Sequence, residues 1–240
     1  MATLQAAVLR EVGSRPHSKL SVLDVGCGNG ATVKAWLNLG ADAHGCDFSF
    51  KPGPDVDDLT NQKRITAIST APYRLPYPDE SFDVVLTNQV MEHVRDYRAT
   101  LAEMRRVLKP DGYCLHTFPA RYVPIEPHIF VPFATVLQAR WWLALWALLG
   151  VRKSTQQGAE WRKVADDNLR YLQRSTNYLT GRELRRNFTS HFGNVRYVER
   201  SFLKNSPNPR GRLLYRAASA LPPLFLLYRV FWSRVILARP

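Results

Sequence analysis

Apolar residues in the first half of the chain form short runs separated by amphipathic segments. Runs of four to six residues are too short for helices and predict buried strands at 22–25, 43–46, 65–69, 82–87 and 113–118. Apolar positions at helical spacing predict helices at 2–12, 30–39 and 97–108. Because strand and helix alternate, the pattern predicts a mostly parallel sheet with helices on both faces.

The second half of the chain has a different pattern. Four prolines between 119 and 132 predict an irregular loop. Helices are expected at 133–149, at 159–174 and after Thr180, where Glu183 completes a capping box. Strands at 195–201 and 231–238, with a Pro-broken helix at 212–228 between them, then complete the sheet.

These elements predict one α/β domain over residues 1–240. Residues 20–119 would form a cofactor-binding core, and residues 120–180 a helical cap inserted into it. Residues 181–240 would supply the carboxyl-terminal helices and the last two strands.

A glycine-rich turn follows the first predicted strand. Gly26, Gly28 and Gly30 let the backbone approach a ligand, and the next helix offers its free N–H groups there. Asp47, about 20 residues on, ends the second strand, where a carboxylate can accept protons from both ribose hydroxyls of an adenosyl group. Because Gly26, Gly28 and Ala31 also fit the dinucleotide fingerprint, the turn alone does not identify the cofactor.

Three further motifs follow this turn in order. They are Leu-Pro-Tyr-Pro-Asp-Glu-Ser-Phe-Asp-Val-Val at 75–85, Asn-Gln-Val-Met-Glu-His-Val at 88–94 and Arg-Val-Leu-Lys-Pro-Asp-Gly-Tyr at 106–113. With these motifs, residues 20–119 resemble the class I S-adenosylmethionine-dependent methyltransferases. The group includes ubiquinone and menaquinone C-methyltransferases and many small-molecule O-methyltransferases. The resemblance implies a Rossmann-like α/β fold with a mostly parallel seven-stranded sheet, an antiparallel last strand and a helical cap insertion.

The resemblance also implies a cofactor site for S-adenosyl-L-methionine. Asp47 would hold the ribose, and Asn88 and Gln89 would lie beside the methionine moiety. The family often has an acidic residue at the position of Ala71, so adenine recognition here would instead use backbone groups near Thr70. The methionine end of the cofactor would be lined by Asp24, Gly26, Cys27, Gly28 and Gly30.

The loop after the fifth strand provides the candidate base. Ligands of open α/β sheets bind outside the carboxyl ends of the strands, where this loop begins. His128 would deprotonate an acceptor hydroxyl and Glu126 would orient it, unless His128 only packs the loop. Glu92 and His93 are expected mainly to shape the cofactor pocket, and His116 to lie in the core. No metal ligand is predicted.

Charge divides the chain into two halves. Residues 1–120 contain 13 Lys and Arg against 14 Asp and Glu, a net charge of −1, whereas residues 121–240 contain 20 against 6, a net charge of +14. Apolar runs at 141–149 and 221–230 lie in the basic half. Both features fit an anionic membrane surface, and the apolar runs also fit a cap core or a homodimer interface; the charge alone fits an ordinary solvated surface.

The scattered cysteines, Cys27, Cys46 and Cys114, form no disulfide framework, and no signal peptide is evident. We therefore expect a cytoplasmic protein that can associate with the inner face of the membrane. Its expected activity is O-methylation of a sugar or lipid-linked small molecule. The alternatives are C-methylation of a quinone-like aromatic and a basic RNA-binding methyltransferase. Nucleic acid is the less favoured partner because no appended RNA-binding module is present, and a non-catalytic cofactor-binding regulator is least favoured.

Overall fold

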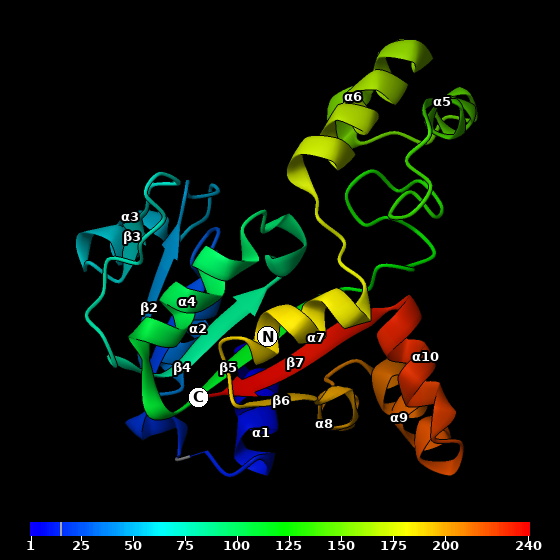
Figure 1. Cartoon of the computed structure of the whole chain (residues 1–240). Helices are drawn as coiled ribbons and strands as arrows, with labels where there is room; N and C mark the ends of the chain where they lie inside the picture. The colour runs from blue at the N-terminus through cyan, green and yellow to red at the C-terminus, as the bar shows by residue number, and fades with distance from the viewer. Residues whose placement is uncertain (15) are drawn as a thin grey trace.

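The computed structural model describes residues 1–14 and 16–240 and contains a seven-stranded sheet in the order β3-β2-β1-β4-β5-β7-β6 (Figure 1). β1 pairs in parallel with β2 and β4, and β7 runs antiparallel between β5 and β6. The mostly parallel sheet and its antiparallel last strand are therefore confirmed. The strands are β1 (Ser21–Val25), β2 (Asp42–Asp47), β3 (Ile65–Ala67), β4 (Phe82–Asn88), β5 (Leu108–Pro119), β6 (Asn194–Tyr197) and β7 (Ser233–Arg239).

Helices cover both faces of the sheet because side chains alternate along each buried strand. In β4, Val84 and Leu86 pack into one apolar cluster with α1, α2 and α3, whereas Val85 packs into another with α4 and α7. The helices concerned are α1 (Ala2–Glu11), α2 (Ala31–Asn38), α3 (Val56–Asn61), α4 (Tyr97–Val107) and α7 (Gly181–Thr189). The short helix α3 was not predicted from the sequence.

The predicted capping box at the start of α7 is confirmed. The Glu183 backbone N–H donates to Thr180 Oγ1 at 3.3 Å, and the Thr180 backbone N–H donates to Glu183 Oε2 at 2.8 Å. Two of the free N–H groups of the helix entry are thereby satisfied. This fixes the point at which the chain returns to the sheet after the cap segment.

The predicted helix at 133–149 is wrong in its first half. Helix α5 (Arg140–Leu148) begins seven residues later. Phe130 and Phe133 have φ values of +61° and +53°, in the left-handed region, and a short bridge joins Ile125 to Pro132. Backbone in that conformation cannot continue an α-helix, so the loop extends beyond its prolines.

Two more predicted elements differ near the carboxyl terminus. The strand expected at 195–201 ends at Tyr197, and α8 (Glu199–Lys204) follows, with the Glu199 carboxylate paired to Arg229 at 2.9 Å. The helix expected at 212–228 consists of two, α9 (Pro209–Ala220) and α10 (Pro223–Phe231). Adjacent prolines at 222 and 223 lack the N–H groups that a continuous helix needs.

Residues 120–180 contain a helix pair that lies apart from the sheet (Figure 1). α5 packs against α6 (Trp161–Ser175), and the pair shares an apolar cluster that includes Leu143, Ala165 and Leu172. Ile129 and Val131 of the preceding loop join the same cluster. The loop thus leaves the sheet at the end of β5 and packs against the cap helices.

Candidate active site

The glycine-rich turn joins β1 to α2 at the carboxyl edge of the sheet. Gly26, Gly28 and Gly30 all have positive φ, at +80°, +57° and +74°. A Cβ on Gly26 would lie 2.4 Å from a Val90 methyl, so that glycine is required by packing. A Cβ on Gly28 would meet nothing closer than Lys51 Cδ at 3.7 Å. Gly28 therefore leaves open backbone of the kind that a ligand can approach.

Two buried side-chain oxygen atoms near this turn lack a hydrogen-bond partner in the described part of the chain. Asp24 Oδ1 and Asn88 Oδ1 are buried and have no hydrogen-bond partner among the described residues. Burial, followed by the nearby Asp47 carboxylate, raises the pKa of Asp24 to about 7. Buried acceptors of this kind need a donor, and the ammonium and hydroxyl groups of an amino-acid nucleoside would supply one.

Asp47 lies at the end of β2, as predicted. Its Oδ2 accepts the Gly28 backbone N–H at 2.8 Å and its Oδ1 accepts the Phe48 N–H at 2.7 Å. Each carboxylate oxygen can accept a further hydrogen bond, so the carboxylate has room for both ribose hydroxyls as donors. Gln89, with φ +57°, follows β4, and Thr70 is exposed in a bridge to Tyr73. The residues thus fit S-adenosylmethionine, and their individual cofactor roles stay predictions.

Glu126 and His128, the predicted catalytic pair, are in contact. Glu126 Oε1 accepts from His128 Nδ1 at 2.8 Å and from the Tyr178 hydroxyl at 2.7 Å, while Oε2 accepts the backbone N–H groups of His128 and Ile129. Burial alone would raise the pKa of Glu126, but hydrogen bonds from His128 and Tyr178 outweigh it and lower the pKa. Because an ionised carboxylate only accepts, His128 Nδ1 carries a proton, so the neutral form of the ring has its lone pair on Nε2.

The turn after β4 lies against this pair. The short 3-10 helix η2 (Met91–His93) contains Glu92 and His93, and the rings of His93 and His128 meet edge to face, with centroids 4.8 Å apart. The Asn177 backbone N–H donates to the Glu92 carbonyl at 2.6 Å, which ties the exit of the cap segment to η2. The sequence did not reveal this contact. His93 and His128 lie on either side of strand β5 in the chain, and their spacing matches no known motif.

Burial raises the pKa of the Glu92 carboxyl to about 7, and burial lowers the pKa of His93. In both side chains, burial therefore favours the neutral form over the charged form. Tyr171, whose ring centroid lies 5.6 Å from that of His128, and Lys153, 4.1 Å above the Tyr171 ring, extend the cluster into the cap. Neither was singled out from the sequence.

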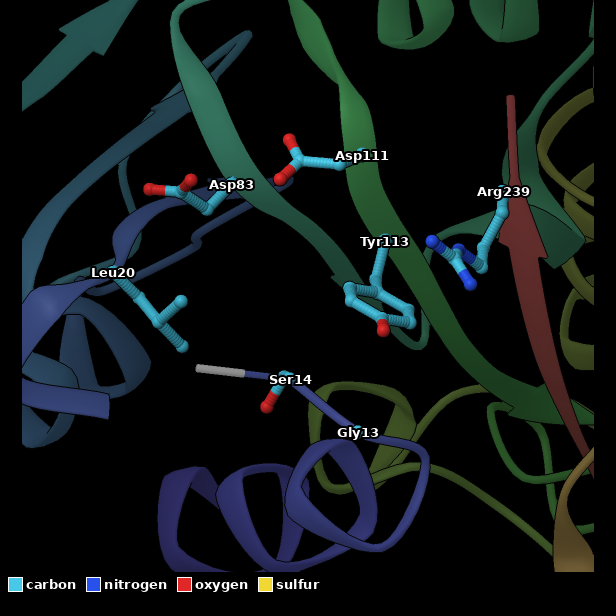
Figure 2. A pocket seen from close by; sticks show the side chains of 7 residues that line it. All are labelled: Gly13, Ser14, Leu20, Asp83, Asp111, Tyr113 and Arg239. Carbon is cyan, nitrogen blue, oxygen red and sulfur yellow. The ribbon is translucent and has the colours of Figure 1, made fainter. Parts of the chain in front are cut away.

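Two other features lie away from this cluster. His116, in β5, is fully buried, contacts Thr87 Oγ1 at 2.8 Å through Nδ1, and has its pKa lowered to about 3 by burial, as expected of a core histidine. Figure 2 shows a pocket that includes Asp83, Tyr113 and Arg239. Asp83 lies at the start of β4, so this pocket belongs to the edge of the sheet opposite the glycine-rich turn.

Known proteins match the same segment. Residues 23–116 match the family model described as a methyltransferase domain. The ubiquinone biosynthesis O-methyltransferase of Cereibacter sphaeroides is 37% identical over 99 residues, which cover 40% of this chain and 40% of that protein. The demethylmenaquinone methyltransferase of Thermobifida fusca is 30% identical over 109 residues, covering 44% and 46%. The chain thus matches less than half the length of these curated relatives.

Solved structures match over the whole chain. An S-adenosylmethionine-dependent methyltransferase from Mesorhizobium loti superimposes with a TM-score of 0.53 at 13% identity, covering 99% of this chain and 100% of that one. This likeness confirms the fold. Together with the match of residues 23–116, it shows that the chain contains a class I methyltransferase domain, whose cofactor is S-adenosylmethionine.

Proposed function

We propose that this chain transfers a methyl group from S-adenosylmethionine to a hydroxyl of a sugar or lipid-linked small molecule. The cofactor, when bound, supplies a methyl group already activated by its sulfonium. The chain's own residues must then hold the acceptor oxygen in line with that methyl and take up the hydroxyl proton.

One observation supports a hydroxyl acceptor. His128 is fixed through Nδ1 by the buried Glu126 carboxylate, which leaves Nε2 able to accept a proton. As the O–CH₃ bond forms and the bond from methyl to sulfur breaks, the hydroxyl proton would pass to Nε2 of His128. Glu126 would stabilise the resulting imidazolium without taking the proton. We infer that His128 is the base and Glu126 its positioning residue.

The acceptor can be sought directly in cells. Mass spectrometry of sugars and lipids from a deletion strain should reveal a species lighter by one methyl group. This species should gain a methyl group when it is incubated with the protein and S-adenosylmethionine. If the methyl-deficient species is a quinone-like aromatic lacking a C-methyl group, C-methylation replaces the proposal. Identical profiles in deletion and parent strains would contradict it.

We further propose that the protein binds anionic membrane surfaces without insertion. One face of α5 packs on α6, while Trp141, Leu145 and Leu148 of α5 are exposed, with Trp141 64% exposed. Leu149, directly after the helix, is exposed as well. A second exposed apolar set, on and beside α9 and α10, contains Leu213, Leu221, Leu226, Leu227 and Trp232. Arg210, Arg212 and Arg216 are exposed on α9. Within residues 1–14 and 16–240, no helix is long and apolar enough to cross a bilayer.

Liposome sedimentation tests this association. The protein should sediment with anionic vesicles at low salt and be released as salt rises, because screening weakens the attraction between the arginines and the lipid headgroups. Replacing Trp141 and Leu148 by Ser should reduce sedimentation, whereas replacing the exposed Ile125 of the loop by Ser serves as a control. Equal recovery in the supernatant with anionic and neutral vesicles would count against the proposal, and a concentration-dependent dimer would assign the apolar surface to self-association.

A further inference from the structure

We propose that Glu92, His93 and His128 form a binding site for one divalent transition-metal ion such as Zn²⁺. Each residue offers one ligand atom, and the three atoms all lie within 4.8 Å of one another. Two come from η2 and one from the loop after β5, so an ion would join the sheet to the loop held by the cap.

Both imidazoles are held in the tautomer that a metal needs. His93 Nδ1 lies 2.6 Å from the Ser175 carbonyl oxygen, and His128 Nδ1 lies 2.8 Å from Glu126 Oε1. Since a carbonyl oxygen and an ionised carboxylate can only accept, the neutral form of each ring has its proton on Nδ1 and its lone pair on Nε2. A metal-bound histidine usually donates its other N–H to a carbonyl or a carboxylate in this way.

Glu92 gives an independent indication of a missing ligand. The residue is 1% exposed, and neither carboxylate oxygen has a hydrogen-bond partner among the described residues. His93 Nε2 lies 3.9 Å from Glu92 Oε1, beyond hydrogen-bond distance. Buried carboxylates nearly always have partners, and an ion bound between Glu92 and the two histidines would provide one.

The donor set favours a particular class of ion. Two imidazole nitrogens and one carboxylate oxygen suit Zn²⁺ and its transition-metal neighbours and leave a fourth position open, whereas Mg²⁺ prefers oxygen ligands alone. Bonds of about 2.1 Å in a tetrahedral arrangement place ligand atoms about 3.4 Å apart. The three ligand atoms, now within 4.8 Å of one another, would therefore have to move closer together when an ion binds.

This inference uses the site of the proposed function but does not depend on methyl transfer. An ion bound to Nε2 of His128 occupies the lone pair that would accept the acceptor's proton, so the two roles exclude one another in one molecule. In the loaded protein, the ion would itself favour loss of the proton from a hydroxyl bound at its open position. Comparing methyl transfer with and without Zn²⁺ shows which form is active.

Isothermal titration of the purified full chain, stripped with a chelator, with Zn²⁺ tests the site directly. We expect one ion per chain and a higher melting temperature on binding. Glu92→Gln, His93→Ala and His128→Ala should each weaken the affinity more than about 100-fold, and Glu126→Gln by about 10- to 100-fold, since it only orients a ligand. His191→Ala, which removes a histidine outside the cluster, should leave the affinity unchanged.

Each result bears on the inference separately from the proposed function. If the wild type and the His93→Ala/His128→Ala double variant bind Zn²⁺ equally, only adventitious surface binding occurs and the inference is wrong. Circular dichroism of each variant must match the wild type, and Glu92→Gln, which preserves side-chain shape, guards against loss by misfolding. Tight Zn²⁺ binding in a protein without methyl transfer would support the metal site while contradicting the proposed function.

Discussion

His128→Ala should lower the rate of methyl transfer about 10²- to 10⁴-fold, the usual contribution of general acid–base catalysis. The substitution removes the imidazole, and with it the Nε2 atom that would accept the hydroxyl proton. S-adenosylhomocysteine affinity should stay nearly unchanged, because the predicted cofactor residues lie near the ends of β1, β2 and β4 and in the segments that follow β1, β3 and β4, not in the loop after β5. Single-turnover kinetics with a fixed acceptor measures the rate, and calorimetry measures the affinity.

Two variants sharpen this experiment. Glu126→Gln should lower the rate less than His128→Ala, because orienting a base contributes less than accepting the proton. Glu126 also accepts the backbone N–H groups of His128 and Ile129, so this variant additionally tests the loop conformation. His191→Ala should behave as the wild type. A loss below about threefold in chelator-treated His128→Ala would rule out His128 as the base. His93 or Tyr122 would then be tested, or the enzyme would act by positioning alone.

Asp47→Ala should weaken S-adenosylmethionine binding by about 1–3 kcal/mol, or about 5- to 150-fold, because two ribose hydroxyls would lose a charged acceptor. Calorimetry with S-adenosylhomocysteine measures the change. Asp42→Ala provides a matched control, since Asp42 is the same residue type at the other end of β2 and pairs with Arg64.

The same titration discriminates between cofactors. The wild type should bind S-adenosylmethionine and show no response to NAD, although the glycine pattern alone fits both. A binding heat with NAD but none with S-adenosylhomocysteine would contradict this assignment. Since Asp47 also accepts the Gly28 and Phe48 N–H groups, thermal unfolding of Asp47→Ala must be compared with that of the control.

The sheet could be predicted from the sequence because local pattern and long-range packing agree there. The apolar run at 22–25 is buried as β1, and the glycines that follow have the positive φ that their residue type allows. The conformation of such elements depends mainly on residues close together in the chain. The pattern of residue types along the chain is therefore enough to predict them. The terminal strand β7 could be placed for the same reason, to within two residues at its start.

The candidate site could be predicted only in pieces. Glu126 and His128 are two residues apart, and their pairing follows from a local turn. The contact between His128 and His93 depends instead on where the long loop and the cap lie, and on the Asn177 backbone, which is 85 residues from Glu92 in the chain, donating to the Glu92 carbonyl. Left-handed φ values at Phe130 and Phe133 also have no signal in residue type, since such backbone usually favours glycine or asparagine.

The position of β7 between β5 and β6 has a consequence for biosynthesis. In β5, Leu115 and Thr117 lie opposite Leu237 and Val235, which follow them by 122 and 118 residues in the chain. During translation, β5 would leave the ribosome long before these partners and would present an unpaired apolar edge. A segment trimmed to residues 23–116, which match the methyltransferase-domain model, would keep that edge permanently. We therefore expect chaperones to bind the nascent chain. We also expect shortened versions that lack β7 to aggregate.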